Sequence, residues 1–473
     1  MGSKWATVSI DDIKSPEKYS CVGGPFGSSL SQKHYVDSGV PVIRGTNLAG
    51  DIFSESGFVF VSPDKANELQ RNMAFRGDIV FTQRGTLGQV ALIPEDSIYE
   101  RYIVSQSQMK LTVNPKQADA YFIYTYFRTN EAKALIENNA IVGGVPHINL
   151  GILKEFKLRL PPLSEQKRIS EVSKSIDNKI NLNRQINQTL EQISQTLFKS
   201  WFVDFDPVID NALDAGNPIP EALQSRAELR QKVRNSADFK PLPADIRALF
   251  PAEFEETELG WLPKDWYHKN AEEIATISIG KTPPRNQKEC FSHKKDSNYT
   301  WVSIKDLGNC NVFIKESSEY LTTDAVNNYN VKIVPKGAVL LSFKLTIGRI
   351  AIAESILTTN EAIAHFYNMK HGVNKEYLYS YLQHFDYNTL GSTSSIATAV
   401  NSKIIRKIPI LLPDTDILHQ YKISTDIIFK RISFNNRNTY DLTALRDTLL
   451  PKLISGELSL EDLPDLVTQT EPA

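Results

Sequence analysis

The stretch SEQKRISEVSKSIDNKINLNRQINQTLEQISQTLFKSWF, residues 164–202, has the pattern of one long amphipathic helix that follows two prolines. Ser164 is a suitable N-cap for its start. Apolar residues recur in alternating steps of three and four, the spacing of a coiled-coil seam, with interruptions at Lys179 and Asn183. A helix of these 39 residues would extend about 58 Å. A seam of that length must be buried against another surface.

A second helix of the same kind is predicted at residues 414–450, with apolar residues 252 positions after those of the first. Its seam is broken by Asn435, Asn436 and Asn438, and polar residues in a seam can fix register and partner. We predict that the two helices pair with each other; the alternative is that each helix docks only on its own module. The predicted seam residues are Ile169, Val172, Ile176, Ile186, Leu190, Ile193 and Leu197 in the first helix and Ile428, Ile432, Leu442, Leu445 and Leu449 in the second.

The region before each helix is also repeated. The motif TxGxxA stands at residues 86–91 and again 260 positions later at residues 346–351. Asn149 recurs as Asn401, at the shift of 252 that the helices share. Because solenoid repeats have much shorter periods, this pattern indicates a duplicated domain. Two similar modules on two similar helices predict a protein in which each module carries out the same kind of task at a separate site.

Each module has the pattern of an α+β domain. Short β-rich runs, such as VPVIRGTNL and GDIVFTQ in the first module and GAVLLSF in the second, are separated by Gly, Pro, Asn and Asp turns. One helix is predicted around residues 117–138, with an aromatic face that favours packing over base stacking. The predicted domains are a first module at 1–160, a first spacer helix at 161–205, an acidic connector at 206–258, a second module at 259–412, a second spacer helix at 413–453 and an acidic tail at 454–473.

Composition favours a cytosolic chain and does not exclude nucleic acid as a partner. The 473 residues carry a net charge of −2, no apolar run long enough for a membrane span, and three scattered cysteines that fit neither a disulfide framework nor a zinc site. Residues 204–265 and 457–473 carry net charges of −6 and −5, so the remaining modules and helices are together about +9. That modest basic bias is compatible with phosphate contacts.

Three short stretches resemble parts of catalytic motifs, but each lacks a residue or a spacing that the motif requires. Gly280-Lys281-Thr282 resembles the end of a phosphate-binding loop, but the glycine required upstream is absent and two prolines forbid the following helix. Asn217-Pro218-Ile219-Pro220 lacks the aromatic residue with which adenine methyltransferases hold a flipped base. Pro63-Asp64 is separated by nearly 70 residues from Glu131-Ala132-Lys133, which is too far for a nuclease motif. The sequence therefore predicts a protein without catalytic activity and without a metal site.

Four stretches in this order resemble the DNA-specificity subunits of type I restriction–modification systems. They are LPPLSEQKRI at 160–169, SWFVDFDPV at 200–208, ELGWLPKDW at 258–266 and LRDTLLPKLISGEL at 445–458, and the paired TxGxxA motifs add to them. The resemblance covers essentially the whole chain.

The resemblance implies two target-recognition domains, each reading one half of a split site in double-stranded DNA. It implies that the two spacer helices pair antiparallel, set the separation of the half-sites and dock two methyltransferase subunits. S-adenosylmethionine would then be bound by the methyltransferase subunits, and ATP and Mg by separate restriction and translocase subunits in the prokaryotic cytoplasm. This chain would bind no cofactor. One departure is that PDTDILHQY stands at the start of the second helix where PPLSEQKRI stands at the start of the first, so the Glu-Gln pair is lost although Gln420 keeps a polar side chain. This departure leaves open whether the two docking sites are equally strong, but not whether both exist.

DNA contacts are expected from Arg, Lys, Asn and Gln side chains on loops and strand ends, because these groups match the major-groove edges of guanine and adenine. Gln83 and Arg84 of the first module correspond in the repeat to Phe343 and Lys344 of the second. Residues that differ between the modules are the better candidates for sequence specificity. Residues that are repeated, such as Thr86 and Asn149, are also explained as shared architecture. The candidates are Arg44, Asn47, Gln83, Arg84, Thr86, His147 and Asn149 in the first module and Lys305, Lys344, Thr346, Arg349, Asn401 and Lys403 in the second.

Two other functions fit parts of the sequence. A solitary DNA adenine methyltransferase or nuclease would need motifs that have drifted beyond recognition. A tandem-module scaffold that binds protein instead of DNA would not need the basic bias of the modules. The missing motifs argue against the first alternative, and the charge distribution argues against the second.

Overall fold

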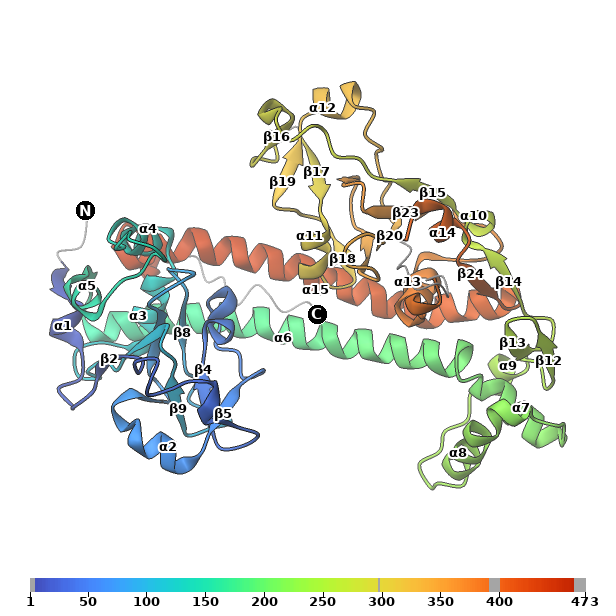
Figure 1. Ribbon diagram of the computed structural model, residues 1–473, viewed down its shortest axis with the longest axis horizontal. Coiled ribbons are helices and arrows are strands. Elements are labelled where there is room, and N and C mark those ends of the chain that lie inside the picture. The colour runs from blue at the N-terminus through green and yellow to red at the C-terminus, as the bar shows by residue number, and fades with distance from the viewer. Residues whose placement is uncertain (1–4, 297, 391–399, 463–473) are drawn as a thin grey trace. The chain divides into compact units, whose positions relative to one another are not determined.

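The computed structural model describes residues 5–296, 298–390 and 400–462. The chain divides into two compact units, one made of residues 1–182 with 439–473 and the other of residues 183–438. Two long helices, α6 (Leu163–Phe202) and α15 (Thr415–Ser455), each contribute one part to each unit (Figure 1). The predicted partition into modules and spacer helices therefore differs from the division into compact units, because both helices are shared.

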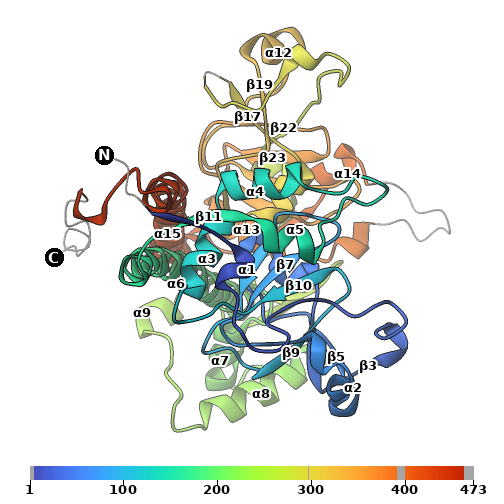
Figure 2. The same cartoon turned by 90° about the vertical axis from the view of Figure 1, so that its left-hand side faces the viewer.

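A four-stranded sheet lies at the centre of the first unit (Figure 2). Its strand order is β2 (Cys21–Gly23), β10 (Gln108–Leu111), β7 (Ile79–Thr82) and β8 (Val90–Leu92), all antiparallel. Helix α3 (Ala120–Phe127) lies against β8, and Phe122 and Phe127 are fully buried. The pair of β1 (Ala6–Ser9) with β11 (Lys157–Leu160) and a mixed sheet complete the module. The mixed sheet has the order β3 (Tyr35–Val36), β5 (Val59–Val61), β4 (Val40–Ile43), β9 (Arg101–Val104) and β6 (Met73–Phe75), with β4 parallel to β9.

The second unit repeats this strand order. Its central strands are β15 (Thr276–Ile279), β23 (Ile363–Tyr367), β20 (Val339–Ser342) and β21 (Ile350–Ala353), with the short strand β18 (Phe313–Ile314) added at the edge. β14 (Tyr267–Asn270) pairs with β24 (Pro409–Leu412) as β1 does with β11, and β17 (Tyr299–Val302) runs parallel to β22 (Thr358–Thr359) as β4 does to β9. Helix α13 (Lys375–His384) takes the place of α3. The sequence repeat is thus a repeat of topology.

The TxGxxA motif is the turn of a β-hairpin in both units. It connects β7 to β8 in the first unit and β20 to β21 in the second. Gly88 and Gly348 have φ of 81° and 87°, a backbone conformation that favours glycine. Ala91 and Ala351 are fully buried on the second strand of each hairpin. The motif therefore fixes the turn and the small core residue beneath it.

In the first unit, the start of α6 packs against the end of α15. Ile169 of α6 shares a buried cluster with Leu449 and Leu453 of α15 and with the aromatic residues of α3. Asp177 of α6 lies 3.4 Å from the Arg446 guanidinium of α15. Helix α15 continues through Pro451, so the C-terminal family motif supplies core residues to the first module.

In the second unit, the remaining parts of the two helices contact each other through a buried asparagine cluster. Asn435 donates to the Asn187 amide oxygen at 2.9 Å, and Asn187 donates to Asn436 at 2.8 Å. Further along, the Phe198 ring lies 6.0 Å from the ring of Tyr421. Because residue numbers rise in α6 as they fall in α15, the helices run antiparallel within this unit. Of the polar residues predicted to interrupt the seam, Asn183 and Asn435 are buried, Asn436 and Asn438 are partly buried, and Lys179 is exposed.

Two residues predicted to lie in the buried seam, Ile193 and Leu445, are exposed, so the prediction is wrong for them. Ile193 is 50% exposed, because the aromatic residues of α13 and α15 contact the neighbouring face of α6, where Ser194 and Phe198 are buried. Leu445 is 38% exposed, because Arg446 takes the inward position toward Asp177. The other predicted seam residues are buried or partly buried: Ile169, Val172, Ile176, Ile186, Leu190 and Leu197 in α6, and Ile428, Ile432, Leu442 and Leu449 in α15.

Local capping corrects two further predictions. The helix expected at 117–138 is two helices, α3 and α4 (Asn130–Asn138), because the Thr129 side chain accepts a hydrogen bond from Ala132 N and starts a new helix. Helix α6 begins at Leu163, so Ser164 lies in its first turn. Gln166 is fully buried and bonds to Asp119 N, Gln117 O and Pro161 O, which ties the start of α6 to its own module.

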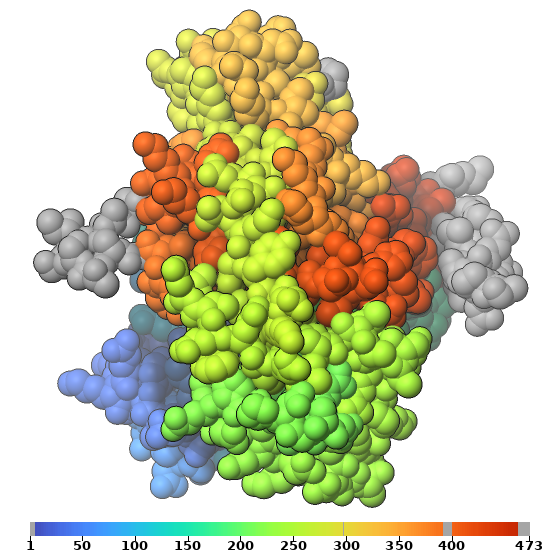
Figure 3. Space-filling model, turned by 90° about the vertical axis from the view of Figure 1, so that its right-hand side faces the viewer, coloured from blue at the N-terminus to red at the C-terminus, as the bar shows by residue number. Residues whose placement is uncertain are grey.

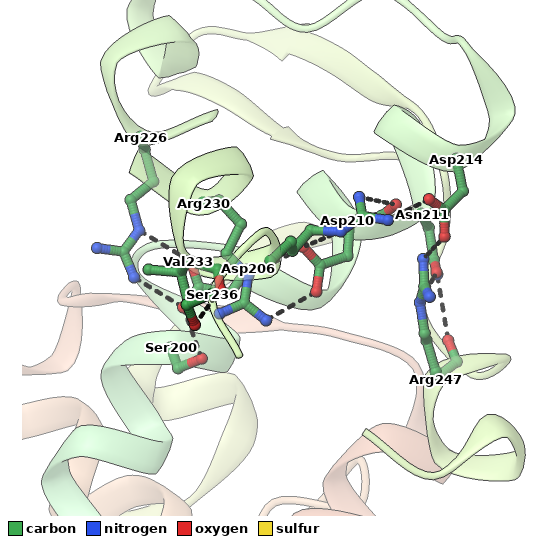
Figure 4. Close-up of polar contacts among 11 residues, drawn as sticks. Ser200, Asp206, Asp210, Asn211, Asp214, Arg226, Arg230, Val233, Ser236 and Arg247 are labelled. Atoms are coloured by element: carbon green, nitrogen blue, oxygen red, sulfur yellow. Dashed lines mark hydrogen bonds and ion pairs between the residues drawn. The ribbon is translucent and has the colours of Figure 1, made fainter. Parts of the chain in front are cut away.

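The acidic connector is a folded part of the second unit, and its surface is continuous with that of the second module (Figure 3). Asp206, Asp210 and Asp214 lie four residues apart on α7 (Asp206–Ala215) and pair with arginines four residues apart on α8 (Gln224–Arg234). Figure 4 shows Arg226 and Arg230 beside Asp206 and Asp210, and Arg247 beside Asp214. Arg226 and Arg230 make bidentate hydrogen bonds of 2.7–2.9 Å to Asp206 and Asp210. These three aspartates are therefore paired within the segment, which keeps its net charge of −6.

Candidate nucleic-acid interface

Four loops of the first unit meet beside the β7–β8 hairpin, and we call them the first loop cluster. They are residues 23–27, 83–88, 105–107 and 141–148. Gln83 N donates to Ser107 O at 2.7 Å, and Ile148 N donates to Gln83 O at 3.0 Å. A Cβ on Gly24 would lie 1.8 Å from Ser105 O, so glycine is required where the first loop crosses the third. The cluster is held together mainly by backbone hydrogen bonds, which leaves side chains free for a ligand.

Several predicted DNA-binding residues lie in this cluster. Arg84 and Thr86 are exposed, and Gln83 and His147 are partly exposed. Arg84 and His147 face each other across an isolated antiparallel bridge. The fold thus brings together two candidate residues that are more than 60 positions apart in the sequence.

Other candidates have structural roles. Asn47 is fully buried, and its amide bonds to Arg44 N, Ser54 O and Ser56 O. The Arg44 guanidinium donates to Gly57 O at 2.7 Å. The hydrogen-bonding groups of Asn47 are therefore occupied inside the module and are not available to a DNA base.

The repeated asparagines cap helices. Asn149 accepts from Ile152 N at the start of α5 (Leu150–Glu155), and Asn401 accepts from Lys403 N and Ile404 N at the start of α14 (Ser402–Arg406). A side-chain oxygen in the N-cap position satisfies a free backbone donor of the helix. Their recurrence is explained by this shared architecture. Lys403 itself is exposed.

The second unit contains a matching group of loops, which we call the second loop cluster: residues 280–285, 343–349 and 359–362. Lys281 N donates to Thr359 O and Phe343 N to Ala362 O, both at 2.9 Å. A Cβ on Gly280 would lie 2.1 Å from Asn360 O, so Gly280 has the role of Gly24. No phosphate-binding helix follows Thr282 in the described segment; Lys281 is instead an exposed loop residue.

The second loop cluster is basic. Lys281 and Lys344 are exposed, and Arg285 is exposed but paired with Glu319 at 2.9 Å. Glu361 is the acidic residue within the cluster. Burial raises the pKa of the Glu361 carboxyl, but the hydrogen bond from Thr282 and the charges of Lys344 and Arg285 hold its pKa below the ordinary value. The carboxylate is therefore ionised at neutral pH and offsets part of the positive charge.

Of the remaining candidates in the second module, some are exposed on the surface and one has its side chain bonded within the module. Lys344 and Thr346 are exposed at the turn of the hairpin, and Lys305 is exposed on α11 (Ile304–Asn309). Arg349 donates to Ile304 O at 2.6 Å and so ties the hairpin to α11. Arg349 therefore has a positioning role that its residue type does not reveal.

A buried histidine anchors the second loop cluster. His365 Nε2 lies 2.6 Å from Thr359 Oγ1, and His365 Nδ1 lies 2.9 Å from Ser278 Oγ. Burial lowers the pKa of His365 to about 3. The neutral ring thus holds the strand end from which residues 359–362 extend.

We expect stability to fall as the pH is lowered from about 6.5 toward 3. Over this range the unfolded chain takes up a proton on His365 while the folded protein does not, because the pKa of His365 is lowered to about 3. Between pH 7 and 5 the loss from this group is about 2 kcal/mol. Chemical denaturation at several pH values measures it. His365→Gln should flatten this dependence, whereas replacement of the exposed His293 should not; an equal slope in both variants would contradict the assignment.

Sequence reasoning missed several surface residues of the two clusters. In the first cluster they are Gln106, which is exposed, and Phe26, which is 84% exposed. In the second they are Lys281 and Arg285. The one available signal was the polar run at residues 105–108 between two apolar strands. The juxtaposition itself depends on contacts between loops far apart in the sequence.

In the described parts of the chain, no three His, Cys, Asp or Glu side chains are grouped so that they could hold a metal ion. Among the same residues, no helix combines the length and apolar character that crossing a bilayer requires.

Comparison with known proteins identifies relatives of the whole chain. The sequence model for the type I restriction modification DNA specificity domain matches twice, at residues 3–192 and 263–436. The HindI specificity subunit of Haemophilus influenzae is 28% identical, over 81% of this chain and 87% of that protein. The MjaIX specificity subunit of Methanocaldococcus jannaschii is 24% identical, over 96% of this chain and 94% of its own. The fold is similar to that of a type I restriction–modification S subunit from M. genitalium, with a TM-score of 0.51 at 14% identity, covering 95% of this chain and 96% of the other.

Proposed function

Because the chain belongs to the type I restriction–modification DNA specificity family, we propose that it is the subunit that selects the DNA sequence for such a complex. Each module reads one half of a split site in double-stranded DNA. The observation that carries the proposal is the pair of loop clusters, which occur at the same place in two modules with the same strand order. Two readers in one chain suit a site with two halves.

Base recognition in this proposal uses the exposed side chains of each cluster. Arg84 suits the O6 and N7 acceptors of guanine, and Gln83 and Gln106 suit adenine. Lys281 and Lys344 suit phosphates, which position the protein without reading sequence. Since Gln83 and Arg84 are matched by Phe343 and Lys344, the two halves of the site are expected to differ.

The partners in the proposal are two methyltransferase subunits and the restriction and translocase subunits of the complex. Exposed apolar side chains on the long helices support a protein-binding role, because monomeric proteins rarely leave many of them in water. On α15 these include Ile423, Ile427 and Phe434, which are 51%, 76% and 51% exposed. S-adenosylmethionine, ATP and Mg are assigned to the partner subunits, and this chain contributes sequence selection without catalysis in the cytoplasm of a prokaryotic cell.

The loss of the Glu-Gln pair in the first turn of the second helix corresponds to a difference in packing. Leu418 stands 252 positions after Gln166 and is fully buried in the core of the second unit. The first helix is tied to its module by an amide and the second by an apolar side chain. Because both side chains point into the protein, the difference does not require unequal docking of the partners.

Arg84→Ala is expected to relax one base-pair position of one half-site and to leave the other half unchanged. A bidentate contact to guanine contributes about 1–3 kcal/mol of discrimination, or about 5- to 150-fold. The measurement is the methylated motif in a host that expresses the chain with its methyltransferase partner. Lys116→Ala is the matched control, because Lys116 is exposed beyond the opposite end of β10. Relaxation of both halves, or of neither, would reject the role of Arg84.

A further inference from the structure

Leu345 is the most exposed large apolar residue in the described part of the second unit. Its side chain is 101% exposed, at the apex of the β20–β21 hairpin between Lys344 and Thr346. A leucine in this position gains nothing from the hydrophobic core. Its backbone adds a second cost, because φ is +62°, in the left-handed region that a Cβ disfavours.

The fold does not require leucine at this turn. The matched position in the first unit is Gly85, whose φ is +102° and which adopts the left-handed region without a side chain. Other residues with positive φ are mostly Gly, Asn, Asp or His, and Phe205 combines a φ of 55° with a ring that is only 7% exposed. Among the described non-glycine residues with positive φ, Leu345 is the one exposed aliphatic side chain, since Phe205 is buried and Tyr19 is partly buried. Contact with a ligand would account for a leucine at this turn.

The surroundings of Leu345 indicate which ligand. Phe343 N donates to Ala362 O, so the hairpin belongs to the second loop cluster, which exposes the cations Lys281 and Lys344. Arg285 of the same cluster is held in an ion pair with Glu319. Cations around an aliphatic tip match the surface of DNA, where phosphates flank the base edges. In the major groove, the apolar feature of a base edge is the C5 methyl group of thymine.

We propose that Leu345 reads a thymine in the second half-site by packing against its C5 methyl group. The inference rests on the proposed function, because it assumes that the second loop cluster faces DNA. Lys344 and Lys281 would hold the flanking phosphates, and the strained turn would carry the leucine into the groove. The first module, with Gly85 at this position, would lack the corresponding contact.

The test is Leu345→Gly in the complete complex with the methyltransferase subunits. Glycine suits the left-handed turn, so the variant is expected to fold with unchanged or higher thermal stability. We expect the methylated motif to lose about 5- to 10-fold of its preference for thymine at one position of the second half. Leu345→Met, which keeps an apolar side chain of similar reach, is expected to retain most of the preference.

A second measurement isolates the methyl group. Replacing that thymine by deoxyuridine in a synthetic duplex is expected to weaken binding of the wild-type complex by the same factor and binding of Leu345→Gly not at all. An unchanged second half in the glycine variant would overturn the proposal. So would a uniform loss of affinity for all sequences, which would indicate a wedge that does not read sequence. If the wild-type complex itself had no split motif, the proposed function would fail before this inference was tested.

Discussion

Replacing Asp177 by alanine is expected to lower the free energy of unfolding of the first unit by about 3–5 kcal/mol. Asp177 accepts two hydrogen bonds from Arg128, at 2.5 and 3.0 Å, and one from the Tyr121 hydroxyl at 2.7 Å. The side chains of Arg128 and Asp177 are only 8% and 13% exposed. Removing the carboxylate leaves the Arg128 charge buried without its partner, and such a loss costs more than the net value of the pair.

The ionisation of Asp177 supports the same expectation. Burial raises the pKa of this carboxyl, but the hydrogen bonds and charge of Arg128 and the hydrogen bond from Tyr121 hold the pKa below its ordinary value. The stabilisation is therefore complete at neutral pH and is lost as the pH falls below about 4. Chemical denaturation of the purified chain measures it.

The matched control for Asp177→Ala is Asp447→Ala. Asp447 pairs with Arg446 on α15 but is 57% exposed, so its removal is expected to cost about 0–1 kcal/mol. Asp177→Asn tests charge separately from shape and is expected to lie between the two. Equal stability of the Asp177→Ala and Asp447→Ala variants would show that the buried cluster does not attach the first module to the helices.

Inserting four helical residues into both long helices is expected to lengthen the spacer between the half-sites by one to two base pairs. The insertion points are after Leu182 in α6 and after Asn438 in α15, where each helix passes from one unit into the other. Four residues add about 6 Å of helix, against about 3.4 Å per base pair along one strand. The insertions keep the Asp177–Arg446 contact in one unit and the Asn187–Asn435 hydrogen bond in the other.

The matched control is the same insertion in α6 alone, which lengthens only one of two antiparallel helices and breaks their register. That variant is expected to lose methylation at every spacing, whereas the double insertion moves it. The readout is the methylated motif in vivo. If the double variant keeps the original spacing, the helix pair does not set the separation of the half-sites.

The duplication was readable from the sequence because constant offsets preserve both strand order and helix register. The identical order of the two central sheets follows from that repeat, and the family motifs proved to be core elements, such as Trp201 and Trp266 at 2% exposure each. Apolar periodicity did not determine which side of each long helix faces its partner. Ile193 and Ser194 differ by about 100° around α6, and only the aromatic residues of α13 and α15 decide which of them is buried.

Residue type was a weaker guide to the interface than to the fold. Asn47, Asn149 and Asn401 match the chemistry of adenine recognition, but the same amide also caps helices and satisfies backbone groups. Conversely, Phe26 and Leu345 gave no signal, because exposure depends on turns that the local sequence does not encode. Loops brought together over more than 60 residues are visible only in the fold.

The most direct test of the central claim is the methylome of a host that expresses this chain with its proposed methyltransferase partner. Two readers in one chain predict a split motif, with methyladenine in both halves and a fixed spacer, that is absent when either protein is expressed alone. A continuous motif, or methylation by this chain without a partner, would contradict the account and would mean that the chain is itself an enzyme.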